Sequence, residues 1–163
     1  MKKLLFFAIT IALPIIASSE LKPLDEILLE NSSNERFVAS YSSKRCAAIY
    51  LEVGKIVQEI EPQTMTVLAE KASELTLFAS LIDSGKTLDE IAMSDVNKTD
   101  KEIKVIWDVL AEASDISYAK TGVYLTPHIK DMKLCRATYP LEESLFWATK
   151  LVTKNYGYIW FDK

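Results

Sequence analysis

The sequence predicts an all-α protein: a single-domain bundle of about four to six helices, stapled by one disulfide and followed by a short extended aromatic carboxyl-terminal tail. Apolar residues recur at three- and four-residue steps over most of the chain, which is the period of helices with one buried face. Prolines, glycines and capping residues interrupt these runs where helices would begin and end. The chain also has only two cysteines, and they lie far apart.

Residues 1–19 have the pattern of a cleaved signal peptide. Lys2 and Lys3 precede an apolar run from Leu4 to Ile16, and the small residues 17–19 follow it. The run has 13 residues, whereas a membrane-spanning helix needs about 20. We therefore expect cleavage after Ser19, or alternatively after Ala17, and no integral membrane segment in the mature chain. The other interpretation, a buried first helix of a cytosolic protein, is disfavoured because the run lacks a polar face.

Export would fix the charge and the redox setting of the mature protein. Loss of residues 1–19 removes two lysines and no acid, so the net charge changes from −4 to −6. Nucleic acids and anionic membranes bind cationic surfaces, so we expect neither as a partner. An oxidising compartment favours pairing of Cys46 with Cys135, which closes a loop of 89 residues and adds roughly 4 kcal/mol of stability.

The cysteines have two alternative roles. They could be a free buried pair, or they could serve a redox or metal site. The second is poorly supported, since the sequence has no C-x-x-C motif and no Cys/His run at zinc-ligand spacing.

The amino-terminal half predicts an arm and a helical hairpin. Residues 20–34 form an arm, which is either a short packed helix or a loosely held segment. The polar residues 31–34 end in capping types and predict a helix over 35–61, whose apolar stripe points Cys46 into the core. Pro62 opens a second helix over 62–82, which Gly85 closes. The short turn between them predicts antiparallel packing.

Two capping boxes follow, Thr87 with Glu90 and Thr99 with Glu102. Each places a hydroxyl and a carboxylate three residues apart, as at a helix amino terminus. They predict a short helix over 88–96 and a longer one over 100–120, which Gly122 ends. The alternative is one long helix with a bend at residues 97–98.

Prolines indicate where the last two predicted helices begin. Thr126 and Pro127 predict a helix over 127–137, and Pro140 opens another that extends to about residue 155. Its apolar stripe is Leu141, Leu145, Ala148 and Val152. Residues 158–161 predict the aromatic tail, either docked on the core or serving as a peg for a partner. Residues 35–163 together make the helical domain.

Few residues are candidates for chemistry. His128 is the only histidine, and Asp131 lies three residues on, so the two are weak candidates for a catalytic or metal pair. A surface or capping imidazole is the ordinary explanation. The four glycines are far apart, which excludes a glycine-rich phosphate loop. We therefore assign no catalytic residue and expect no metal and no cofactor.

The arginines beside the cysteines suggest a binding site. Arg45 precedes Cys46 and Arg136 follows Cys135, so a disulfide would bring both guanidinium groups together, with Tyr50 and Tyr139 near them. Such a fork can bind a carboxylate or phosphate group. In the interpretation that we favour, each arginine instead pairs with an acid such as Glu52, Glu142 or Glu143 and has only a structural role.

The sequence thus favours an exported soluble protein, periplasmic or secreted, that binds rather than catalyses. A chaperone-like or accessory role in a bacterial envelope fits this pattern, with another protein or a small anionic ligand as partner. One alternative is a small periplasmic hydrolase that uses His128. Another is a subunit of an envelope complex that attaches through Trp160 and Phe161.

Overall fold

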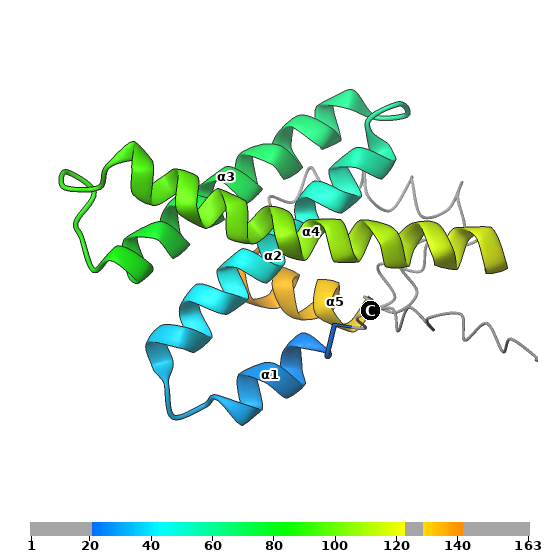
Figure 1. The fold of residues 1–163 in the computed structure, drawn as a ribbon. Helices are drawn as coiled ribbons and strands as arrows, with labels where there is room; N and C mark the ends of the chain where they lie inside the picture. Colours follow the sequence, from blue (N-terminus) through cyan, green and yellow to red (C-terminus); the bar gives the residue numbers. More distant parts are fainter. Residues whose placement is uncertain (1–20, 123–128, 142–163) are drawn as a thin grey trace, which may run out of the picture.

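A computed structural model describes residues 21–122 and 129–141, which form five helices and no strand (Figure 1). The predicted all-α fold is confirmed. Residues 1–19, His128, the predicted helix beyond Leu141 and the aromatic tail lie outside the described residues. None of the helices described is both long and apolar enough to cross a bilayer. The helices are α1 (Leu24–Glu30), α2 (Glu35–Val57), α3 (Pro62–Ser84), α4 (Met93–Thr121) and α5 (Ile129–Thr138).

Helix α2 is the centre of the bundle and packs against each of the other four described helices. In Figure 1, α4 crosses in front of α2, α3 lies above it, and α1 and α5 lie below. Every residue from 42 to 50 is buried, so this helix is enclosed on all sides rather than along one stripe. Four of these nine residues are serine or alanine, and such short side chains let neighbouring helices approach closely.

The ends of α2 and α3 follow local chemistry. The Asn34 side chain accepts a hydrogen bond from the Phe37 amide at 3.1 Å and caps α2 at the predicted start. The helix ends at Val57, four residues before the predicted end, and a turn follows in which the amides of Ile60 and Glu61 both donate to the Val57 carbonyl. Pro62 then opens α3. Gly85, at φ 68°, ends α3 in the left-handed conformation that favours glycine.

The predicted short helix over 88–96 and the helix start at residue 100 are wrong, because α4 is continuous from Met93 to Thr121. Thr87 and Glu90 do hydrogen-bond each other, at 2.9 Å, but within a turn. The Asp95 carboxylate caps α4 instead, by accepting from the Ala92 amide at 3.0 Å. Thr99 lies inside the helix and is 2% exposed. Gly122 ends α4 as predicted.

The amino-terminal arm is a packed helix. Helix α1 contacts both α2 and α5, and Leu24 at its start is fully buried in the core. Burial of a leucine side chain contributes about 2 kcal/mol. The core itself combines residues of all five helices: Leu24, Cys46, Ala47, Ala48, Ile49, Tyr50, Val53, Val57, Leu68, Ala72, Leu75, Ile103, Leu110, Met132 and Cys135.

Candidate functional site

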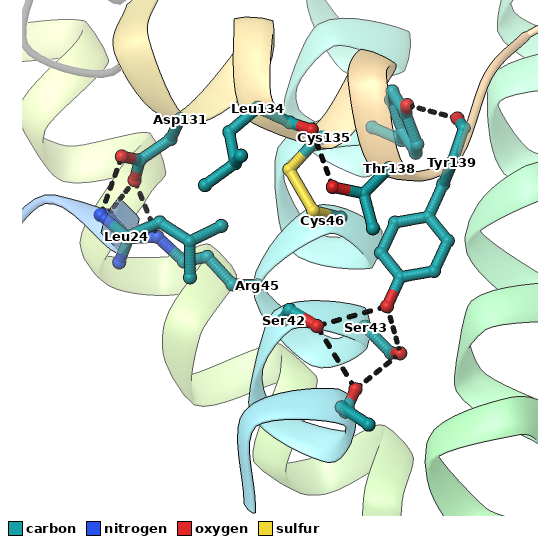
Figure 2. Close-up of a disulfide and its surroundings, with 12 residues drawn as sticks. Leu24, Ser42, Ser43, Arg45, Cys46, Asp131, Leu134, Cys135, Thr138 and Tyr139 are labelled. Carbon is teal, nitrogen blue, oxygen red and sulfur yellow. Dashed lines mark hydrogen bonds and ion pairs between the residues drawn. A yellow bond between two sulfur atoms is a disulfide. The ribbon is translucent and has the colours of Figure 1, made fainter. Parts of the chain in front are cut away.

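Most of the residues that the sequence singled out lie along the contact between α5 and α2 (Figure 2). Asp131, Cys135 and Tyr139 follow one another at four-residue steps, so they share one face of α5 and its end. Each of the three is joined to α2 by a different kind of bond. The short helix is therefore attached to the core along its whole length.

The middle attachment is the predicted disulfide between Cys46 and Cys135, whose Cα atoms are 5.3 Å apart. Both cysteines are at most 1% exposed. The predicted pairing is confirmed, and the bridge is shielded from reagents in solution while the protein is folded.

The second attachment is an ion pair between Arg45 and Asp131. Nε and Nη2 of Arg45 donate to Oδ2 of Asp131 at 2.9 and 2.5 Å, and the Leu24 amide donates to Oδ1 at 2.8 Å. Arg45 is 0% exposed and Asp131 is 2% exposed. One carboxylate thus fastens α5 to α2 and also holds the start of α1. Nη1 of Arg45 has no hydrogen-bond partner among the described residues.

The third attachment is made by tyrosines at the end of α5. The Tyr139 hydroxyl lies 3.0 Å from the Ser42 hydroxyl and 2.8 Å from that of Ser43. The Tyr50 hydroxyl donates to the Tyr139 carbonyl at 3.0 Å. Burial raises the pKa of Tyr50 above its ordinary value, so the phenol stays neutral. These bonds fix the chain where it leaves α5.

The two arginines do not form one exposed fork. Arg45 lies in the interior, and its partner is Asp131 rather than Glu52; Glu142 and Glu143 lie outside the described residues. Arg136 is half-buried; this burial lowers its pKa, and the neighbouring Tyr50 opposes that shift. Asp131, the predicted neighbour of His128, uses both carboxylate oxygens within the fold. Among residues 21–122 and 129–141, no three His, Cys, Asp or Glu side chains lie close enough to hold a metal ion.

A second buried acid, Glu52, was not singled out as a site residue. It is 1% exposed, and its Oε2 accepts a hydrogen bond from the Trp107 indole nitrogen at 2.8 Å. Burial raises the pKa of Glu52, and the indole bond opposes this. Its Oε1 has no hydrogen-bond partner in the part of the chain that the structure describes. The sequence does contain a signal that Glu52 is buried: it lies three residues after Ile49 and four before Ile56, on the predicted apolar stripe.

Trp107 also lines an open groove of about 500 Å³ between α2, α3 and α4. The floor is mostly apolar, and Lys55 stands exposed at the rim. Gly54 lies in this groove, where α2 and α3 approach closely: a Cβ atom there would lie 3.7 Å from that of Leu68. The lining residues are Tyr50, Leu51, Gly54, Lys55 and Gln58 of α2 and its end, Met65 and Ala69 of α3, and Trp107, Asp108 and Ala111 of α4.

A polar cluster centred on Lys44 also joins α2, α3 and α4. The Lys44 ammonium group lies 2.5 Å from carboxylate oxygens of both Asp83 and Glu102, and the Ser40 hydroxyl donates to Asp83 at 2.6 Å. Partial burial by itself lowers the pKa of Lys44, but the two carboxylates raise it above its ordinary value. Because the lysine of α2 pairs with an acid of α3 and an acid of α4, the cluster fastens the three helices together.

Comparison with known proteins identifies no relative: the chain matches no protein-family model, no curated protein and no solved structure.

Proposed function

We propose that this chain is an exported, disulfide-stapled helical protein of the periplasm or the cell exterior, and that it acts by binding another protein rather than by catalysis. The observation that carries the proposal is the buried pair of Arg45 and Asp131. Arg45 was the candidate for binding an anionic ligand, and Asp131 was the candidate partner of His128. The two neutralise each other and hold three helices together.

Two further observations support parts of this proposal. The Cys46–Cys135 bridge suits an oxidising compartment, and residues 1–19 have the pattern of an export signal. A small anionic ligand is less favoured as the partner than a protein, because Arg45 is 0% exposed and only Arg136 of the two arginines reaches the surface.

Export is tested by the mass of the chain recovered from the periplasm or the medium. We expect an amino terminus at Glu20 or Ser18 and a mass that rises by two hydrogens on reduction. A retained Met1, or two free thiols in the recovered chain, would contradict the proposal.

Binding and catalysis are separated with His128→Ala. The purified chain and the variant are assayed against chromogenic ester, phosphate, peptide and glycoside substrates. We expect neither to exceed a heat-denatured sample of the wild-type chain. An activity present in the wild type and lost in His128→Ala would establish the hydrolase alternative instead.

The partner is sought by cross-linking an affinity-tagged chain in intact cells, followed by reciprocal capture from the identified protein. We expect His128→Ala to retain the same partner. Deletion of residues 158–163 distinguishes the third alternative: loss of the partner only in that variant would assign attachment to an envelope complex through the aromatic tail.

A further inference from the structure

We propose that the groove between α2, α3 and α4 is the docking site of this chain's own carboxyl-terminal segment, residues 142–163, with the stripe Leu145, Ala148 and Val152 against its floor. The groove is lined mainly by apolar side chains, which include Leu51, Met65 and Trp107. Exposed apolar surface of this kind normally receives an apolar partner.

The place where the described chain ends points to this occupant. The Tyr139 carbonyl accepts a hydrogen bond from the Tyr50 hydroxyl at 3.0 Å, and Tyr50 lines the groove. Leu141, two residues further on, is packed against the core. The segment that follows therefore starts beside the groove. A tethered segment has an effective concentration that a separate partner must exceed.

The dimensions of the groove and of the segment agree. The part of α2 that lines the groove runs from Tyr50 to Gln58, a length of about 12 Å at the helical rise of 1.5 Å per residue. The stripe from Leu145 to Val152, if helical, spans about 10 Å by the same rise. An apolar stripe at three- and four-residue steps laid into a groove is a common mode of helix recognition.

Charged side chains line the groove as well. Lys55 is exposed at the groove rim, on the helix that also carries Tyr50. The segment begins with Glu142 and Glu143, and its lysines at 150 and 154 come later. Asp108 also lines the groove and is exposed, so the groove offers both signs of charge to a segment that begins with acids and continues with lysines.

Paired cysteines in the full-length chain test the contact. Ala111→Cys in the groove is combined in turn with Leu145→Cys, Ala148→Cys and Val152→Cys, and mild oxidation is followed by peptide mass mapping. Ser73→Cys, exposed on α3 outside the groove, is the control partner for the same three positions. We expect an intramolecular bridge to Ala111→Cys in at least one pair, at several times the control yield.

Two outcomes would overturn the inference. Equal yields from Ala111→Cys and Ser73→Cys would show that the segment does not favour the groove. Bridges that form only between two chains would assign the groove to a second copy of the protein.

Limited trypsin digestion gives a second readout that needs no new cysteine. Ala111→Arg places a bulky charge in the groove, and Ser73→Arg places the same residue outside it. We expect cleavage after Lys150 and Lys154 to accelerate at least tenfold in Ala111→Arg and to stay at the wild-type rate in Ser73→Arg. The same cleavage rate in both variants would contradict docking in this groove.

Discussion

Asp131 on α5 holds two helices at once: its Oδ2 accepts two hydrogen bonds from Arg45 on α2, and its Oδ1 accepts the Leu24 amide at the start of α1. Leu24 and Asp131 are 107 residues apart in the chain. Burial of an ion pair costs both charged groups their hydration. Replacement of one partner alone leaves the other charge buried and unpaired, so it destabilises the protein much more than replacement of both partners.

The Asp131→Asn variant should lose about 3–5 kcal/mol of unfolding free energy, because the Arg45 charge stays buried without its partner. The amide oxygen can still accept the Leu24 N–H bond. Urea denaturation measures the loss. The matched control is Glu30→Gln, in the exposed pair of Lys22 and Glu30, which should change stability by less than about 0.5 kcal/mol.

The double variant Arg45→Met with Asp131→Asn tests the same coupling. It should be more stable than Asp131→Asn alone, since no unpaired charge is left in the interior. If the double variant lost as much unfolding free energy as the Arg45→Met and Asp131→Asn variants lose together, a direct interaction between these side chains would be contradicted.

Replacement of both cysteines by alanine should cost about 4 kcal/mol, because the unfolded chain loses the constraint of the Cys46–Cys135 loop. Urea denaturation of the oxidised wild type and the double variant gives the difference. Reduction of the wild type should be slow without denaturant, because both sulfurs are buried. Fast reduction by dithiothreitol in the native state would contradict the buried placement of the bridge.

Glu52→Gln should stabilise the protein at neutral pH and have less effect near pH 4. Burial raises the pKa of Glu52 in the folded state, so the folded protein binds its proton more tightly than the unfolded chain. Stability then falls as the pH rises above the ordinary glutamate value of about 4.3 towards the raised one. Urea denaturation between pH 4 and 8 follows the difference between wild type and variant.

The control for this pH dependence is Glu112→Gln, an exposed acid on α4. Its stability difference from wild type should be nearly constant over the same pH range. A difference for Glu52→Gln that does not grow with pH would contradict a raised pKa at Glu52.

Asp83→Asn should destabilise the protein by about 1–2 kcal/mol at pH 7. Partial burial acts to raise the pKa of Asp83, but Lys44 and Ser40 lower it below its ordinary value. The stabilisation is thus present above the ordinary pKa of about 3.9 and is lost as the pH falls through the lowered one. The cost of the substitution should shrink below pH 4, whereas exposed Asp89→Asn should change little at any pH.

Local sequence signals determined four of the helix ends. Asn34 caps α2, Pro62 opens α3, and Gly85 and Gly122 end α3 and α4 where the sequence predicted. These signals act through the backbone within one helical turn, so the sequence alone carries them. They failed at Thr99, where a hydroxyl and a carboxylate three residues apart lie inside α4, because packing of a continuous helix outweighed the capping pattern.

The sequence by itself determined the helical class. It also determined the bond between Cys46 and Cys135, because only two cysteines follow the signal-peptide pattern. Only the tertiary structure decided the environment of each charged group. Arg45 became an interior residue because α2 is enclosed on all sides, and a buried guanidinium group requires an acid within hydrogen-bond distance. Asp131 meets that need across 86 residues of sequence. No local pattern specifies such a pairing, because it depends on how separate helices pack.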